Sequence, residues 1–117
     1  MELLVGADAL DYCVHKVIVA ASFAGVELPI RDGVANEDLL KLNEQARSML
    51  LRQDGENYLA QHNAILRSIA QTSPAAGLYG KTDFDAAQVD QWLDFAWSSL
   101  EVPLQVFAEL KTGSGLV

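Results

Sequence analysis

Basic side chains and cysteine are scarce in this sequence. Among its 117 residues, 8 are Lys or Arg and 16 are Asp or Glu, which gives a formal net charge of −8. A surface of this sign repels phosphate backbones, so direct binding to nucleic acid is disfavoured. The single cysteine, Cys13, cannot form a disulfide within the chain, which favours a reducing compartment or carries no information about it.

Long hydrophobic runs are also lacking. The most apolar run, residues 17–24, is far shorter than the ~20 residues that a membrane-spanning helix needs. The opening residues, Met1-Glu2-Leu3-Leu4-Val5, have neither the basic start nor the long apolar stretch of a secretory signal. We therefore expect a cytoplasmic domain that has no membrane partner.

Apolar and charged residues occur instead in the proportions of a globular chain. Half of the residues are hydrophobic and 21% are charged. Their spacing predicts a strand at residues 2–5, a helix over residues 10–24, a strand at residues 26–30 and a short helix over residues 36–46.

A hairpin and a third helix are predicted next. Asp54-Gly55 lies between the apolar runs 49–52 and 57–60, and Gly tolerates the positive φ that tight hairpin turns require. A helical pattern then begins near Asn63 and ends at Ser73-Pro74. Strand–helix–strand units favour a parallel pair, to which the hairpin adds antiparallel strands. The resulting order, βαβαββα, predicts an α/β fold of the thioredoxin-like kind.

The rest of the chain is predicted to be helical. Residues 75–82 have the composition of a linker, so we assign residues 1–74 to the thioredoxin-like domain and residues 83–117 to a second, all-α part. An apolar stripe that includes Trp92 indicates a core-facing helix, and Pro103 is expected to break or kink it and to begin another. With one or two helices, this part is expected to be cut short, to continue in a longer protein, or to be completed by a partner.

Two segments carry a resemblance to a known family. The segment Leu59-Ala60-Gln61-His62-Asn63-Ala64-Ile65-Leu66-Arg67 resembles the start of the third helix of glutathione transferases, which follows an Asp-Gly hairpin. Residues 78–80 and 87–96 resemble the linker and the first helix of the helical domain in that family. The sequence is closest in type to the glutathione-transferase-like domains of translation proteins: elongation factor 1 gamma, the domains appended to glutamyl-, methionyl- and valyl-tRNA synthetases, and their scaffold cofactors.

The resemblance implies a glutathione site whose residues have been replaced. Family members hold glutathione against a cis-proline, and the corresponding place here is Ser48 or Met49. Their Glu-Ser pair, which binds the γ-glutamyl group, falls on Gln61-His62, and their activating Tyr, Ser or Cys aligns best with Asp11. A carboxylate at that last position would repel a thiolate. The resemblance therefore predicts a degenerate site at Asp11, Met49, Gln61 and His62, with no catalytic residue and no cofactor.

Single reactive side chains give weaker signals. Cys13, near the start of the first helix, is either a thiol of lowered pKa or, more simply, a small buried hydrophobe. Tyr12 is one residue out of register with the family's activating tyrosine. His15 and His62 lack a third ligand at a useful spacing, so no metal site is expected.

The resemblance favours a non-catalytic domain that assembles aminoacyl-tRNA synthetase or elongation-factor complexes in translation. Its partner would be another glutathione-transferase-like domain or a second copy of itself. The family pairs through its second helix, fourth strand and third helix, which correspond here to residues 39–46 and 58–71. The predicted interface residues are Tyr58, Gln61, His62, Arg67 and Gln71. Trp97 is either a core residue or a further interface anchor. The alternative function is an active glutathione or related thiol transferase with an atypical site.

Overall fold

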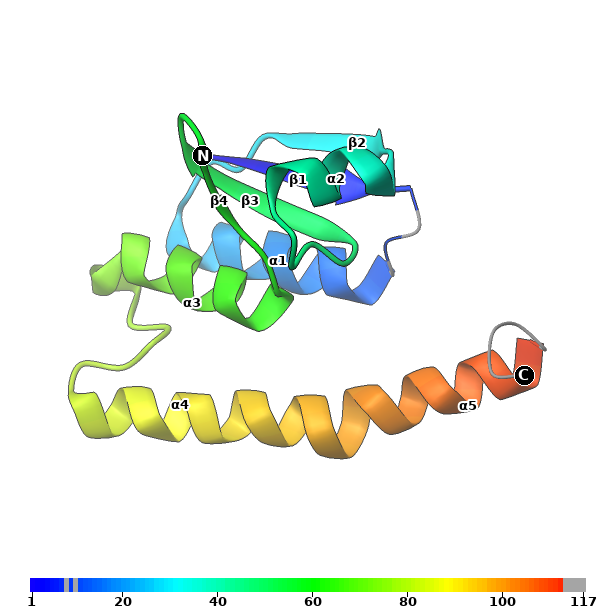
Figure 1. Ribbon diagram of the computed structural model, residues 1–117. Coiled ribbons are helices and arrows are strands. Elements are labelled where there is room, and N and C mark those ends of the chain that lie inside the picture. Colours follow the sequence, from blue (N-terminus) through cyan, green and yellow to red (C-terminus); the bar gives the residue numbers. More distant parts are fainter. Residues whose placement is uncertain (8, 10, 113–117) are drawn as a thin grey trace. The chain divides into compact units, whose positions relative to one another are not determined.

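The computed structural model describes residues 1–7, 9 and 11–112 of the chain (Figure 1). The chain forms two structural units, residues 1–79 and residues 80–117. The first unit contains a four-stranded sheet, and the second unit is helical where it is described. Within the described ranges, every helix is too short or too polar to span a bilayer.

The first unit follows the predicted order of strands and helices. Its elements are β1 (Glu2–Gly6), α1 (Asp11–Ala24), β2 (Ile30–Val34), α2 (Asn36–Leu42), β3 (Met49–Asp54), β4 (Asn57–Leu59), α3 (His62–Thr72) and the short 3-10 helix η1 (Pro74–Ala76). The strands lie in the order β2-β1-β3-β4. β1 is parallel to β2 and antiparallel to β3, and β3 is antiparallel to β4. The predicted α/β, thioredoxin-like fold is confirmed.

The two central strands, β1 and β3, are apolar on both faces. Leu3 pairs with Leu51 and Leu4 pairs with Leu50 across the two strands. All four side chains are almost completely buried. Because successive side chains of a strand point to opposite faces of the sheet, the two pairs belong to two separate cores.

Helices cover both faces of this sheet (Figure 1). α1 and α3 pack together on one face, where Val17 and Ile69 join the cluster that contains Leu3 and Leu51. α2 covers the other face, where Leu39 packs with the second cluster. Burying one such side chain contributes roughly 1.5–3 kcal/mol. Both helical layers are therefore needed to keep the central strands away from water.

The second strand lies later in the sequence than predicted. β2 covers Ile30–Val34, and the expected strand at residues 26–30 is wrong except for its last residue. The N–H of Val26 instead donates to the carbonyl of Ala21 (2.9 Å) and completes the end of α1. Val26 and Leu28 then pack against the core below the sheet. β2 itself is an edge strand whose side chains are mostly exposed, so it carries no apolar pattern.

The second helix ends at Leu42, earlier than the predicted end near Ala46. Asn43 has an extended backbone with φ −154°, and its side-chain oxygen accepts the N–H of Gln45 at 2.8 Å. Such a local side-chain bond competes with continuation of the helix, so the chain leaves the helix at this residue.

The predicted hairpin between β3 and β4 is confirmed. Asp54 pairs with Asn57 at the end of the ladder, and Gly55 at the turn has a positive φ of +45°. The side-chain amide of Asn57 donates to the carboxylate of Asp54 at 2.6 Å, which closes the turn with a second bond. A residue without a Cβ is favoured at this φ, as the Asp-Gly signal implied.

The second unit is one continuous helical segment. It consists of α4 (Asp83–Phe95), a π-helical turn η2 (Ala96–Glu101) and α5 (Val102–Thr112). Pro103 does not interrupt this segment, so the expected break is absent, but Pro103 is the second residue of α5 and a new α-helical element does begin beside it, as expected. Proline has no N–H and its ring crowds the carbonyl four residues earlier. The helix widens just before it: Val102 donates to the carbonyl of Trp97, five residues back, in the bonding pattern of a π-helix.

Trp92 is not a core residue, which corrects the prediction from the apolar stripe. It is 67% exposed, and its ring meets the ring of Phe95 edge-on at a centroid distance of 5.7 Å. A single helix cannot bury its own apolar side chains, because burial needs a second layer of secondary structure. Other large hydrophobic side chains that are exposed on this unit include Phe84, Leu104, Phe107 and Leu110.

α4 begins with a capping box. The hydroxyl of Thr82 accepts the N–H of Asp85 (3.1 Å), and the Asp85 carboxylate accepts the N–H groups of Lys81 (3.1 Å) and Thr82 (3.3 Å). These donors, that of Lys81 first, hold the pKa of Asp85 below its ordinary value. Gly80 is required beside the box, since it has a φ of +77° and a Cβ there would collide with the Cβ of Asp85.

We expect Asp85→Asn to destabilise the start of α4 at pH 7 and to have a smaller effect at pH 3. Because the pKa of Asp85 is lowered on folding, its stabilising effect is complete above the ordinary carboxyl pKa of about 4 and is lost as the pH falls through the folded-state value. Urea unfolding followed by far-UV circular dichroism at both pH values measures this. Asp83→Asn removes the same charge from the same turn and is the control; equal losses for Asp85→Asn at the two pH values would contradict the prediction.

Candidate functional site

Met49, which the resemblance places at the cis-proline position, lies in the core. It is the first residue of β3, pairs with Val5 and is 3% exposed. The carbonyl of the preceding Ser48 accepts the N–H of Gly6 at 2.7 Å. Throughout the described residues the peptide bonds are trans. The Ser48 carbonyl is thus already used within the sheet, and the Met49 side chain is not accessible to a ligand.

Gln61 and His62 lie where β4 leads into α3. The exposed Gln61 flanks the helix and donates from its side-chain amide to the carbonyl of Gln45 at 3.5 Å. His62 is half-buried, and its Nδ1 lies 3.4 Å from the ammonium group of Lys16 on α1. The same ammonium donates to the side-chain oxygen of Asn63 at 3.4 Å. An ammonium group therefore lies beside the start of α3, where the family's Glu-Ser pair places a carboxylate.

The residues near the start of α1 separate into exposed and buried ones. Asp11 is the first residue of α1, and its side chain lies outside the described part of the structure. Tyr12 is 38% exposed, whereas Cys13 is 6% exposed and belongs to the core between α1, α3 and the sheet. Packing of this kind shields a thiol from reagents, which supports the interpretation of Cys13 as a small buried hydrophobe.

The predicted interface residues are spread over both units. Tyr58 lies on β4, half-buried against the core beneath α2. Four others, all at least partly exposed, lie on α3 or just before it: Gln61, His62, Arg67 and Gln71. Trp97 lies in η2 of the second unit and is 42% exposed. The role of these residues in pairing stays a prediction.

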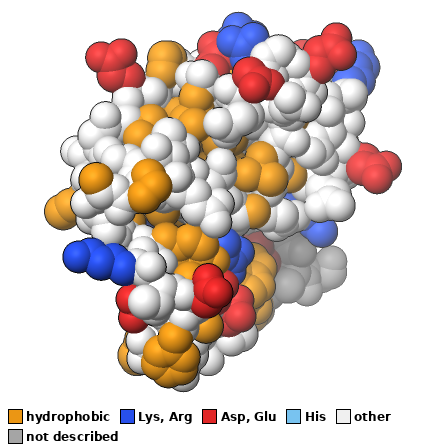
Figure 2. Space-filling view, turned by 90° about the vertical axis from the view of Figure 1, so that its left-hand side faces the viewer, with side chains coloured by type: hydrophobic (Ala, Val, Ile, Leu, Met, Phe, Trp, Pro, Cys, Tyr) orange, Lys and Arg blue, Asp and Glu red, His pale blue; other side chains and the backbone are white. Residues whose placement is uncertain are grey.

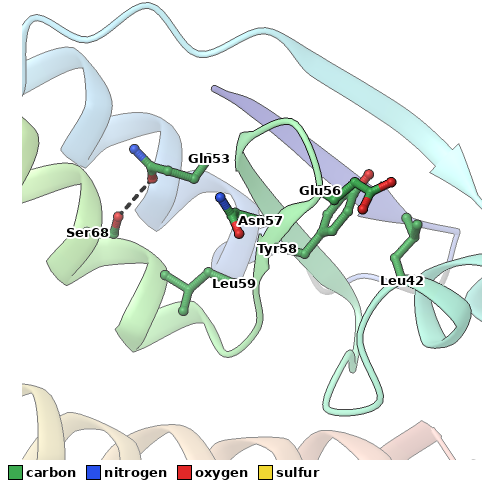
Figure 3. A pocket seen from close by; sticks show the side chains of 7 residues that line it. All are labelled: Leu42, Gln53, Glu56, Asn57, Tyr58, Leu59 and Ser68. Carbon is green, nitrogen blue, oxygen red and sulfur yellow. Dashed lines mark hydrogen bonds between the residues drawn. The ribbon is translucent and has the colours of Figure 1, made fainter.

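A groove lies next to Tyr58, between the end of α2, the β3–β4 hairpin and α3 (Figure 3). It has a volume of about 500 Å³ and is open to solvent. We call it the hairpin groove, and its lining residues are Leu42, Gln53, Glu56, Asn57, Tyr58, Leu59 and Ser68. Among the predicted interface residues, Tyr58 alone lines it.

The sequence indicated the segments beside this groove but missed most of its lining. Gln53, Glu56 and Asn57 lie around the hairpin tip, which the sequence analysis treated only as a turn. One signal was available, because Leu51 and Gln53 would point to the same face of the sheet in a regular strand. Leu51 belongs to the core that α3 covers, and Gln53 does lie beside α3, although the pairing of β3 with β4 shifts between Arg52 and Asp54.

Polar groups in the hairpin groove are held by bonds to neighbouring side chains. The hydroxyl of Ser68 donates to the side-chain oxygen of Gln53 at 3.3 Å, a bond that joins α3 to β3 (Figure 3). Asn57 is held by the carboxylate of Asp54 at 2.6 Å. These bonds restrain Gln53, Ser68 and Asn57 before any partner binds, which lowers the entropic cost of binding at these residues.

On the face shown in Figure 2, charged side chains of both signs are spread out, with exposed hydrophobic side chains between them. The ion pairs found among the described residues include Glu2 with Arg52 (3.3 Å) and Glu2 with Arg31 (3.6 Å), which link three strands of the sheet. The excess of acidic groups therefore forms a general negative field, and on this face it is not concentrated in one patch.

Solved structures define the class of protein. No protein-family model matches the chain. Poplar glutathione transferase F1 matches 99% of this chain and 57% of its own, with a TM-score of 0.79 and 17% sequence identity. A theta class glutathione S-transferase from Xanthomonas axonopodis pv. citri, solved with glutathione bound, matches 86% of this chain and 49% of its own, with a TM-score of 0.68 and 26% identity. The fold is therefore that of a glutathione-transferase-like protein.

Proteins with similar sequences narrow the resemblance to one kind of glutathione-transferase-like protein. Elongation factor 1-gamma from Trypanosoma cruzi is 32% identical over 114 residues, which are 92% of this chain and 28% of that protein. Relatives of the same name from Prunus avium, Arabidopsis thaliana and Oryza sativa are 26–31% identical. The chain spans 22–29% of the length of these curated relatives. The resemblance is confirmed: the chain has a glutathione-transferase-like fold and is similar in sequence to elongation factor 1-gamma.

Gln61 has a backbone conformation that side-chain-bearing residues rarely adopt, with φ +74° and ψ +119°. Its carbonyl accepts the N–H of Ile65 at 3.0 Å, so the first turn of α3 is closed directly after the strained residue. Sequence reasoning gave no sign of this strain. Strained residues of this kind cluster at ligand and partner sites.

We expect Gln61→Gly to stabilise the first unit by about 1 kcal/mol, because glycine adopts a positive φ without steric cost. Gln61→Ala keeps the Cβ and should give no such gain. Gln71→Gly, near the end of the same helix, is the matched control and should destabilise by about 1 kcal/mol. Free energies of unfolding in urea measure all three, and equal values for Gln61→Gly and Gln61→Ala would contradict the assignment of strain.

Proposed function

We propose that this chain is a non-catalytic, glutathione-transferase-like domain that holds translation proteins together by pairing with another domain of the same fold. The partner would belong to an elongation factor or to an aminoacyl-tRNA synthetase complex. The observation that carries the proposal is the coexistence of two features in one fold: an altered glutathione site and a formed groove on the surface through which the family pairs.

The chemistry at the altered site supports a function without glutathione. A γ-glutamyl group carries both an ammonium and a carboxylate, and the ammonium of Lys16 beside His62 would repel the first and attract the second. Gln61 is neutral, so it gives the ligand no compensating carboxylate. The buried Met49 and the buried Cys13 offer no accessible group for binding or for activating a thiol.

The pairing surface consists of α2, β4 and α3, and the hairpin groove lies within it. Tyr58 connects the groove to the core, since it lines the groove and also packs on the cluster beneath α2. Tyr is among the residues most enriched at the energetic centres of protein interfaces, because it buries a large apolar ring and keeps a polar end. Gln61 and Gln71 are exposed at the two ends of α3 and would lie at the rim.

We expect the tagged chain to capture glutathione-transferase-like translation proteins from a cell extract, and Tyr58→Ser to weaken this capture at least about tenfold. A loss of that size corresponds to about 1.4 kcal/mol, well within the effect of truncating a central interface tyrosine. Tyr12→Ser is the matched control, because it truncates an exposed tyrosine on α1 instead. Circular dichroism checks that both variants fold. Recovery of no synthetase or elongation-factor subunit would contradict the proposal.

An active glutathione or related thiol transferase is the second candidate. The glutathione-bound theta class enzyme, at 26% identity, is the observation that favours it. It requires a ligand to bind a site in which Gln61, His62 and Met49 replace the family's residues.

The two candidates differ in their response to glutathione, and we expect no rise in melting temperature up to about 10 mM of the reduced peptide. A ligand that binds the native state with a dissociation constant of about 0.1 mM would stabilise it by about 2.7 kcal/mol at that concentration, which a thermal melt detects readily. A saturable rise would overturn the non-catalytic proposal. Oxidised glutathione at the same concentration controls for non-specific effects of the peptide.

A further inference from the structure

The hairpin groove contains one negatively charged side chain, that of Glu56, for which the structure shows no partner among the described residues. Four of the uncharged lining residues make contacts within the fold. Gln53 and Ser68 form a hydrogen bond with each other, and Tyr58 and Leu59 pack on the two cores. Among the described residues, no hydrogen bond or ion pair of the Glu56 side chain is found. Glu56 is exposed at the hairpin tip and is the sole charged residue of the lining.

We infer that the hairpin groove binds an apolar side chain of the partner together with an adjacent basic side chain, and that Glu56 selects the basic one. This inference rests on the proposed pairing function and adds the chemistry that the partner must present. The partner segment that fits this description is a helix or loop of another domain in which an aromatic or aliphatic side chain lies next to an Arg or Lys.

The apolar half of this recognition comes from three side chains. Leu42 is 42% exposed, and Tyr58 and Leu59 are half-buried, so each offers apolar surface to the groove. The volume of about 500 Å³ is large enough for one aromatic or aliphatic side chain, which the open groove would cover on one side. Covering these side chains with one aromatic ring removes apolar area from water, which is the main favourable term in association.

The basic half follows from the sign of the charges. Glu56 lies toward the end of the groove formed by Tyr58 and Leu42, away from the Gln53–Ser68 bond (Figure 3). A cation beside the anchored ring would therefore meet this carboxylate. The formal charge of −8 over the whole chain adds a long-range attraction for a basic partner and repels an acidic one.

The free edge of β4 favours a side-chain anchor over an added strand. Edge strands often bind extended peptides through their unpaired backbone groups. Here the carbonyl of Tyr58 already accepts the side-chain amide of Asn43 at 3.2 Å. This bond would compete with a backbone donor of an incoming strand at Tyr58, which favours recognition by the side chains in the groove.

The test uses N-acetyl-phenylalanyl-arginine amide as the probe and the same peptide with citrulline, which keeps the shape of arginine without its charge. Backbone amide shifts of the whole 117-residue chain, measured by NMR at low salt, locate and quantify binding. We expect saturable shifts at residues 53–59 and at Ser68. The arginine peptide should bind about three- to fivefold more tightly than the citrulline peptide, the size expected for one exposed ion pair.

Glu56→Gln should remove this preference and leave binding of the citrulline peptide unchanged. Glu27→Gln is the matched control, because it removes the same charge from an exposed loop before β2, at the opposite edge of the sheet. Raising the salt concentration should reduce the preference in the same way, because exposed charges are screened.

Equal binding of the two peptides, shifts outside the groove, or an unchanged preference in Glu56→Gln would each overturn the inference. So would self-association of the chain that fills the groove and that neither peptide displaces. The capture experiment separates this failure from that of the pairing function. If Tyr58→Ser loses the translation partner and Glu56→Gln keeps it fully, pairing stands and the selection of a basic side chain is wrong.

Discussion

The pairing of β1 with β3 is the constraint on which the rest of the first unit depends. Both strands are buried on two faces, so a shift of one residue would move every leucine to the wrong side of the sheet. Once the register is set, α1 and α3 must lie on one face and α2 on the other. The position of the hairpin groove follows, because β4 can extend the sheet only beside β3. A surface proposed for binding is thus determined by leucines that no partner touches.

Elements with their own apolar period or turn signal could be predicted from the sequence. β1, α1, the hairpin and α3 are of this kind, since each shows a strong local pattern that agrees with its place in the fold. β2 is different, because it is ordered by pairing with β1, and its exposed side chains show no apolar alternation. The end of α2 was missed for a related reason: it depends on one side-chain bond of Asn43, which composition does not reveal.

The candidate site was predictable only as far as the family motif reached. That motif placed Gln61 and His62 at the start of a helix, where the structure has them, and their role in a site stays a prediction. It could not show that Met49 is buried, or that Gln61 is strained, because both depend on three-dimensional neighbours. The groove was out of reach for the same reason, since its bond between Gln53 and Ser68 joins residues 15 positions apart on different elements. Periodicity describes one element at a time, whereas a groove belongs to several.

The π-helical turn of the second unit has a consequence for how its surface is organised. Such a turn contains one residue more than the α-helical turn that it replaces, and each residue of an α-helix advances the side chain by about 100° around the axis. Side chains after Glu101 are therefore rotated relative to the positions that an uninterrupted helix would give them. The apolar residues of α4 and those of α5 then form two stripes that are offset around one axis. One continuous helical segment therefore presents apolar surface in two directions.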